Sequence, residues 1–243
     1  MINSQTFSEI IPDKLYLGND KIIENNELIS SKGIRAIVNV TENTYNYPDS
    51  VIIHHCNVKD TLDQGIYRRL PGGAMVDWTE DAAQFIDKQL AQGNKVYVHC
   101  AMGISRSPTL VIYYLMSRPL FCRLIFGQSM NLSEAYTHVL SKRAYVCPNI
   151  GFMKCLMKYE KNQYGTDSLT EKEYTVLQCN VLFPSIEVKD IESVYSSVET
   201  LPTLNKSSIS IDPIGYRMID ELIKKYPGKL KKRYGTSHHH PFD

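Results

Sequence analysis

The sequence predicts an α/β fold, in which a mixed, largely parallel five-stranded sheet is flanked by helices and followed by a C-terminal extension. Two observations support this class. Stretches with helical periodicity separate the apolar runs, and the clearest is Trp78–Ala91, whose apolar residues fall on one face. The short runs of β-branched and aromatic residues that read as strands lie near residues 7–11, 14–17, 35–40, 51–58 and 95–99.

The last of these strands leads directly into a turn and a helix. Lys95–His99 is β-branched and aromatic, which is typical of a buried strand. Ser107–Met116 reads as a helix with Ser107 near its N-cap and Pro108 in its first turn, where a missing N–H group costs nothing. Cys100 is therefore predicted to lie on a turn from strand to helix.

The turn after Cys100 has the composition of an anion-binding loop. Gly103 permits a close backbone approach, and the helix that follows adds its positive N-terminal end. Such a nest favours the thiolate form of a cysteine, which is the nucleophilic form. Arg106 carries a planar fork that can hold two phosphoryl oxygens at once. We therefore predict a phosphate-binding loop made of Ala101, Met102, Gly103, Ile104, Ser105 and Arg106.

The segment His99–Thr109 resembles the Cys-x5-Arg signature of the protein tyrosine phosphatase superfamily. Its Ser-Arg-Ser-Pro-Thr part is similar to the dual-specificity phosphatases in particular. Because we see no second docking domain in the sequence, the chain resembles the atypical members of that family. A buried structural cysteine before a capping serine is the alternative. The resemblance implies a phosphatase fold and a catalytic domain over residues 1–162, and it extends to Leu15–Gly18, Gly33–Val40, Pro148–Phe152 and Tyr159–Glu160.

The resemblance also implies a general acid. A thiolate that attacks phosphorus needs an acid to protonate the leaving oxygen, and later a base to activate water. In the family an aspartate at the end of the strand near 51–58, on a mobile loop, does this work, and Asp60 stands at that place. Asp63 is the alternative acid, and a turn-forming role is the structural alternative for Asp60.

Three further residues are predicted to support the chemistry. Ser107 donates to the sulfur of Cys100 and stabilises the departing thiolate, a role compatible with capping a helix. His99 orients the loop by hydrogen bonding rather than by transferring protons. Asn149 lies on the family's Pro-Asn segment and is expected to brace the phosphate loop, with an N-cap of the next helix as the alternative.

Composition and charge limit the class of function. The 243 residues carry a formal net charge of +1, which gives no reason to expect nucleic acid as a partner. The six cysteines show no paired CxxC spacing, and no apolar run approaches the roughly 20 residues of a membrane span. We expect reduced thiols in a soluble protein of the cytoplasm, with the nucleus as a further location. We assign no cofactor and no metal.

Two segments depart from the dual-specificity pattern. Residues 64–74 lengthen the path from the acid to the Trp78 helix, and their Arg68 and Arg69 are either substrate contacts or solvated loop residues. Residues 117–127 form an apolar insertion, for which packing is the default and an exposed docking patch the alternative.

Residues 163–243 form the predicted C-terminal extension, which is partly helical. Ser, Thr, Asn and Pro around 195–213 indicate a linker or surface segment, and Ile214–Tyr226 reads as a helix. A basic run follows at 224–233. We interpret it as a solvated tail in preference to a contact with nucleic acid or anionic lipid.

The loop composition also bears on the substrate. Lipid and RNA phosphatases of the superfamily place Lys or His inside the loop, whereas residues 101–105 carry no charge. We therefore predict dephosphorylation of phosphotyrosine, phosphoserine and phosphothreonine in proteins through a phosphocysteine intermediate. The expected partners are phosphorylated proteins, kinases among them. The alternatives are a phosphatase of phosphoinositides or RNA 5′ phosphates, and a non-catalytic module that binds phosphoproteins.

Overall fold

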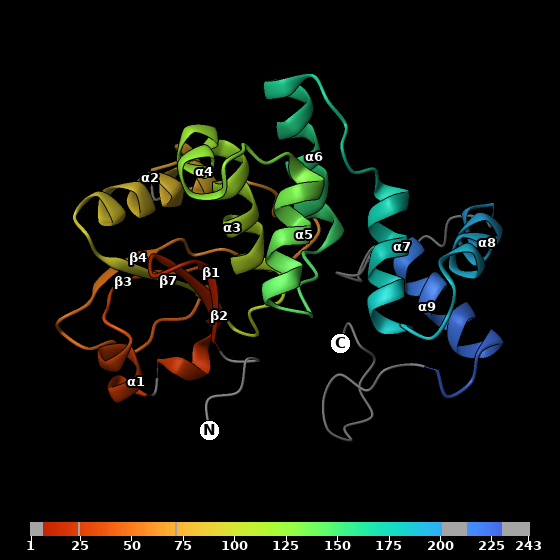
Figure 1. The fold of residues 1–243 in the computed structure, drawn as a ribbon, viewed down its shortest axis with the longest axis horizontal. Helices are drawn as coiled ribbons and strands as arrows, with labels where there is room; N and C mark the ends of the chain where they lie inside the picture. The colour runs from red at the N-terminus through yellow and green to blue at the C-terminus, as the bar shows by residue number, and fades with distance from the viewer. Residues whose placement is uncertain (1–6, 24, 71, 201–212, 230–243) are drawn as a thin grey trace. The chain divides into compact units, whose positions relative to one another are not determined.

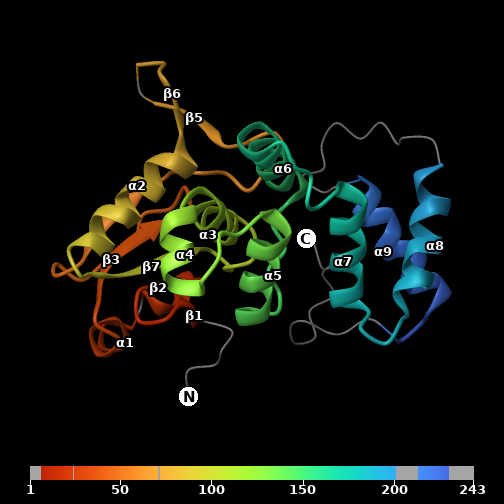
Figure 2. The same ribbon diagram turned by 45° about the horizontal axis from the view of Figure 1, so that its top comes forward.

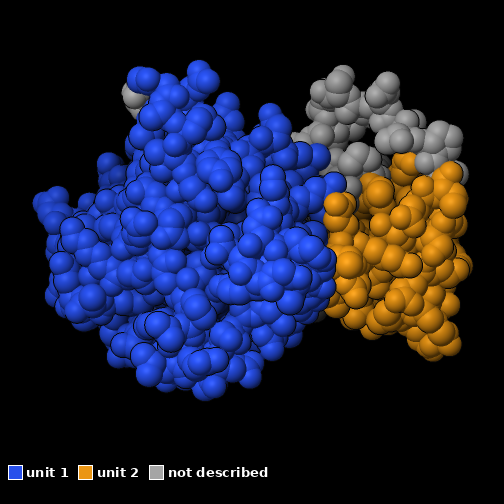
Figure 3. Space-filling view, turned by 90° about the horizontal axis from the view of Figure 1, so that it is seen from above, with its two compact units in different colours: residues 1–168 blue, residues 169–243 orange. Residues whose placement is uncertain are grey.

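The computed structural model describes residues 7–23, 25–70, 72–200 and 213–229. The chain divides into two compact units, residues 1–168 and 169–243 (Figure 3). The first unit contains the sheet and the candidate site, and the second is helical.

A five-stranded sheet forms the centre of the first unit, in the order β1-β2-β7-β3-β4 (Figure 1). The β1–β2 pair is antiparallel and the other pairs are parallel, so the predicted mixed, largely parallel sheet is confirmed. The central strand β7 is buried from Val96 to Cys100, as expected for a parallel strand covered on both faces. The strands are β1 (Phe7–Ile11), β2 (Leu15–Asn19), β3 (Ile34–Asn39), β4 (Ile52–His55) and β7 (Lys95–Cys100).

Helices cover both faces of this sheet (Figure 1). The short helix α1 (Asn26–Ser31) lies on one face, over a core that includes Ile29, Ile37 and Tyr97. The opposite face is covered around α3, which is buried from Ser107 to Met116 and packs against four other helices. The helices on this face are α2 (Trp78–Ala91), α3 (Arg106–Ser117), α5 (Leu132–Lys142) and α6 (Ile150–Tyr164).

Two predicted boundaries next to the candidate site are corrected. Strand β4 ends at His55, because Asn57 adopts a left-handed backbone with φ of 52°, so Asp60 lies in a loop and not at a strand end. Helix α3 begins at Arg106 with Ser105 at its N-cap position. Ser107 therefore lies inside the first turn, where its hydroxyl is directed to another partner.

Asn131 caps α5, because its side chain accepts from the backbone N–H of Glu134 while the Glu134 carboxylate accepts from the backbone N–H of Asn131. This reciprocal pair is a capping box, and it satisfies two N–H groups at the helix start.

The two segments that depart from the family pattern form regular structure. In the first, β5 (Tyr67–Arg69) and β6 (Met75–Asp77) pair as an antiparallel hairpin that projects beyond α2 (Figure 2). The second forms α4 (Pro119–Phe126), which buries Cys122 but leaves Leu120 75% and Leu124 85% exposed. Part of this insertion packs as predicted, and its opposite face is open to solvent.

No single helix in the described ranges is long and apolar enough to cross a membrane. Helices α3 and α4 pass such a test only as a pair, and they are bent by 88° relative to each other.

The second unit contains α7 (Glu171–Leu182), α8 (Val188–Glu199) and α9 (Pro213–Lys225) around an apolar core of its own. The helix predicted at Ile214–Tyr226 is confirmed as α9. The predicted start of the linker, near residue 195, is wrong, because Tyr195 and Val198 belong to α8 and are buried in this core. Residues 201–212 and the end of the basic run, 230–233, lie outside the described residues.

Candidate active site

The C-terminal end of β7 places Cys100 at the start of the predicted phosphate loop. Its Sγ accepts hydrogen bonds from the backbone N–H of Gly103, at 3.2 Å, and from the hydroxyl of Ser107, also at 3.2 Å. Cys100 is a free thiol and is only 1% exposed. Two hydrogen-bond donors therefore converge on one buried sulfur atom.

Gly103 is required at its position in this loop. Its φ is +67°, and a Cβ there would lie 2.5 Å from the carbonyl oxygen of Gly18 in β2. The loop is also held by Arg143, which is 2% exposed and donates to the carbonyl oxygens of Gly103, at 2.6 Å, and Met102, at 3.0 Å. Because the positively charged Arg143 side chain binds these two carbonyl oxygens, the loop keeps the curvature that wraps it around the sulfur of Cys100.

Arg106, the predicted phosphate clamp, lies beside Asp60, the predicted acid. Their Nε and Oδ2 atoms are 3.4 Å apart, and Arg106 Nη1 donates to the carbonyl oxygen of Val58 at 3.2 Å. The Arg106 Nε atom is buried and has no hydrogen-bond partner among the described residues. Arg106 Nε is therefore ion-paired with Asp60 without making a hydrogen bond to it.

Asp60 is held at the edge of the loop through its other carboxylate oxygen. Oδ1 accepts from the Ser105 hydroxyl at 2.7 Å and from Asn149 Nδ2 at 2.8 Å. Because Ser105 belongs to the phosphate loop and Asn149 to the start of α6, the acid is tied to both elements. The role of Ser105 goes beyond the loop membership predicted from the sequence.

Asn149 caps α6, which is one of its two predicted alternatives, while its side chain contacts the loop of Asp60 and not the phosphate loop. Its Oδ1 accepts from the backbone N–H of Phe152 at 3.0 Å and so caps α6. Its Nδ2 donates to Asp60 and, at 3.4 Å, to the carbonyl oxygen of Thr61. Only its backbone N–H reaches the phosphate loop, by donating to Ser105 Oγ at 3.1 Å. The side chain braces the acid loop, which we define as residues 58–66.

His99 precedes Cys100 on β7 and is fully buried. Its Nε2 is 3.0 Å from the hydroxyl of Tyr47, and its Nδ1 is 3.3 Å from the carbonyl oxygen of Cys100. Burial lowers the pKa of His99 to about 4, so the ring is neutral near pH 7. A neutral ring with these contacts orients the backbone at Cys100. Tyr47 lies in a loop without a local sequence pattern and was not predicted.

Residues 15–162 match a family model described as "Dual specificity phosphatase, catalytic domain". The chain belongs to this family. It is 34% identical over 168 residues to human dual specificity protein phosphatase 16, an alignment that covers 68% of this chain and 23% of that protein. The chain thus spans less than a quarter of this relative's length.

Solved structures show the same fold. Human DUSP28 superposes with a TM-score of 0.52 at 23% identity, over 64% of this chain and 93% of that one. A human tyrosine phosphatase-like serine/threonine/tyrosine-interacting protein superposes with a TM-score of 0.51 at 25% identity, over 65% and 97% of the two chains. These likenesses confirm the predicted phosphatase fold.

Within this family member, the structure separates the two candidate acids. Asp63 is exposed, and a hydrogen bond from the side chain of Thr61 lowers its pKa. Asp60 lies 3.4 Å from Arg106 and accepts a hydrogen bond from Ser105 of the phosphate loop, so it is the carboxylate that the structure places at the loop. The geometry therefore favours Asp60.

The arginines of the hairpin also differ. Arg68 Nη2 lies 3.3 Å from Asp81 Oδ2 on α2, and its side chain is 19% exposed. This arginine holds the hairpin against α2. Arg69 is exposed, so of the two only Arg69 is presented as a substrate contact.

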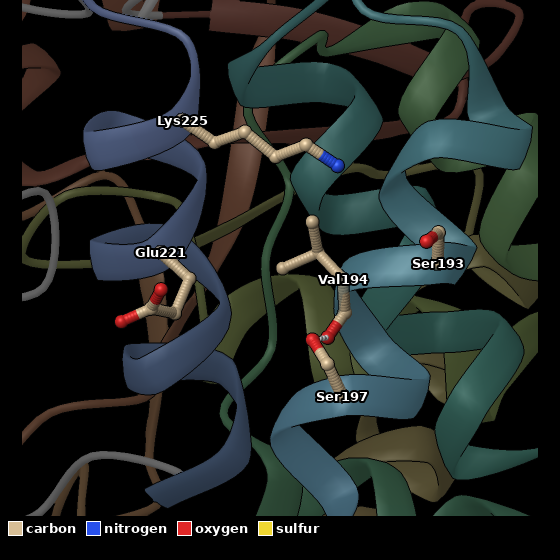
Figure 4. A pocket seen from close by; sticks show the side chains of 5 residues that line it. All are labelled: Ser193, Val194, Ser197, Glu221 and Lys225. Atoms are coloured by element: carbon tan, nitrogen blue, oxygen red, sulfur yellow. Dashed lines mark hydrogen bonds between the residues drawn. The ribbon is translucent and has the colours of Figure 1, made fainter.

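The second unit contains a hollow of about 280 Å³ between α8 and α9 (Figure 4). Glu221 on its rim already pairs with Lys224 at 2.9 Å, and the Ser197 hydroxyl donates to the carbonyl oxygen of Val194 at 2.8 Å. Two of the polar side chains that line the hollow are therefore already engaged within the protein. Within the described ranges, no group of three or more His, Cys, Asp or Glu side chains is arranged to hold a metal.

Proposed function

We propose that the chain is a protein phosphatase that hydrolyses phosphotyrosine, phosphoserine and phosphothreonine through a phosphocysteine intermediate. One observation carries the proposal. The buried sulfur of Cys100 has two donors directed at it, and Arg106 follows in the same loop, with a buried Nε that lies 3.4 Å from Asp60 Oδ2 but makes no hydrogen bond within the described residues. A phosphoryl group in the loop gives this donor an acceptor.

In the first step, the Cys100 thiolate attacks phosphorus and the bond from phosphorus to the leaving oxygen breaks. Arg106 turns from Asp60 to the phosphoryl oxygens, where its charge stabilises the transferring group together with the loop N–H groups. Asp60 gives its proton to the leaving oxygen, so the substrate departs as a neutral alcohol or phenol.

In the second step, water attacks the phosphocysteine and the bond from phosphorus to sulfur breaks. The Asp60 carboxylate accepts the proton of the attacking water. The Ser107 hydroxyl, 3.2 Å from Sγ, donates to the sulfur as it regains its negative charge. Inorganic phosphate then leaves, and the thiolate is restored.

The lining of the loop supports a singly phosphorylated substrate. Residues 101–105 carry no charged side chain, so Arg106 is the loop's one cationic side chain. Met102 is 51% exposed and presents an apolar side chain to solvent from the loop. This composition suits the side chain of a phosphoprotein better than a ligand with several phosphates.

The test is hydrolysis of an aryl phosphate by the full chain, with and without vanadate, followed by parallel assays on phosphopeptides, phosphoinositides and 5′-triphosphorylated RNA. We expect metal-independent, vanadate-sensitive turnover that is abolished in Cys100→Ser and highest on phosphopeptides. Full activity of Cys100→Ser contradicts the mechanism. Preferred turnover of phosphoinositide or RNA contradicts the substrate class. Binding without phosphate release in a single-turnover assay identifies a binding module instead.

A further inference from the structure

Gly151, the second residue of α6, lies directly against the backbone of the acid loop. A Cβ at this position would be 2.2 Å from the carbonyl oxygen of Leu62, 2.8 Å from its carbonyl carbon and 3.0 Å from its Cα. Gly151 is not among the residues with positive φ, so its own conformation accepts a side chain. The helix does not require glycine here. The approach of the acid loop requires it.

The acid loop is attached on both sides of Leu62. Upstream, Asp60 is bound by Ser105 and Asn149. Downstream, Trp78 donates from Nε1 to the carbonyl oxygen of Gly65 at 2.9 Å and from its backbone N–H to that of Ile66 at 3.0 Å. Leu62 lies between these two attachments. A force that pushes Leu62 away from α6 therefore strains the bonds that hold Asp60.

We propose that Gly151 is a positioning residue for the general acid. Its missing side chain sets the distance at which the acid loop packs on α6, and this distance keeps the Asp60 carboxylate within reach of Arg106 and the phosphate loop. The inference rests on the proposed function, because it assigns a role to Gly151 in the proton transfer that Asp60 makes.

The size of the displacement follows from the geometry. A carbon and a carbonyl oxygen that are not bonded to each other lie about 3.3 Å apart or more. A Cβ on Gly151 would start at 2.2 Å, so the loop must retreat by about 1 Å. A misplacement of about 1 Å in a catalytic group lowers the rate by up to about 100-fold. Alanine also has a higher helix propensity than glycine. A lower rate in Gly151→Ala therefore does not come from a less stable helix.

The experiment compares Gly151→Ala with Asp60→Ala and with Lys158→Ala, a matched change at an exposed position of the same helix. Each variant is assayed on two substrates. The leaving group of 4-nitrophenyl phosphate hardly needs protonation by an acid, whereas the leaving group of phenyl phosphate needs it. We expect Gly151→Ala to lower kcat for phenyl phosphate by about 10- to 100-fold and for 4-nitrophenyl phosphate by only a few fold. Lys158→Ala keeps both rates.

Vanadate inhibition provides the second readout, because it reports the phosphate loop and not the acid. We expect Gly151→Ala to retain the vanadate affinity of the unsubstituted chain. An unchanged ratio of the two rates, in a chain where Asp60→Ala changes that ratio, overturns the inference and leaves the proposed function intact. Loss of vanadate affinity overturns it as well, because Gly151 then serves the phosphate loop or the fold. An inactive unsubstituted chain instead contradicts the proposed function.

Discussion

His99 makes the stability of the first unit depend on pH. The residue is 0% exposed, and burial lowers its pKa from 6.5 to about 4. Between these two values the unfolded chain binds a proton that the folded chain does not bind, so the free energy of unfolding falls as the pH falls. Its contribution is constant above pH 6.5, and the loss is complete near pH 4. The sign follows from a folded pKa below the unfolded one.

The magnitude follows from the same values. The difference between the unfolded pKa of 6.5 and the folded pKa of about 4 corresponds to about 3 kcal/mol when the loss is complete, at about 1.4 kcal/mol per pKa unit. At about pH 5.5, one unit below the unfolded value, the loss is about 1 kcal/mol. Asparagine at this position does not titrate, so His99→Asn removes this part of the pH dependence.

Urea unfolding at about pH 7.5 and about pH 5.5 checks this reasoning. Trp78 is the chain's one tryptophan and is fully buried in the first unit, so its fluorescence reports that unit. Between the two pH values, the unsubstituted chain is expected to lose about 1 kcal/mol more than His99→Asn. Tyr47→Phe keeps His99 buried and is the control that retains the full loss. Equal losses in the unsubstituted chain and His99→Asn refute the reasoning.

Three other substitutions probe the loop and the acid. Gly103→Ala places a Cβ 2.5 Å from a backbone oxygen and is expected to abolish inhibition by vanadate; retained inhibition contradicts the loop geometry. Asn149→Ser keeps an N-cap residue, so the free energy of unfolding is expected to change by about 0.5 kcal/mol or less. The variant loses the hydrogen bond from Asn149 to Asp60, so kcat for phenyl phosphate is expected to fall about tenfold. An unchanged kcat argues against the support of Asp60 by Asn149. Ser107→Ala is expected to slow phosphocysteine hydrolysis about tenfold, seen as a burst of nitrophenol in stopped-flow measurements; steady release without a burst argues against this role.

The strand, the loop and the first turn of α3 could be predicted because they are contiguous. Cys100, Gly103 and Ser107 lie within eight residues of one another, so their chemistry and their order define the loop. The cap of α7 also has a local signal that the prediction did not use. Thr170 and Glu173 form a capping box, and the Thr-x-x-Glu spacing is readable in the sequence.

The long-range contacts of the site could not be predicted in this way. Arg143 binds two loop carbonyls from about 40 residues away, and a buried arginine has the same sequence signature as an exposed one. The packing of Gly151 on Leu62 is likewise a contact between distant backbones. A glycine early in a helix does not reveal which segment approaches it.

The sequence by itself determined the sheet class and the strand, loop and helix that hold Cys100, because each depends on side-chain chemistry or periodicity over a few neighbouring residues. The tertiary structure alone decided that Asp60 and not Asp63 adjoins Arg106, and that Asn149 serves the acid loop. These relations join segments separated by tens of residues. Their distances depend on how helices and loops pack, and a difference of about 1 Å in that packing is enough to change the chemistry.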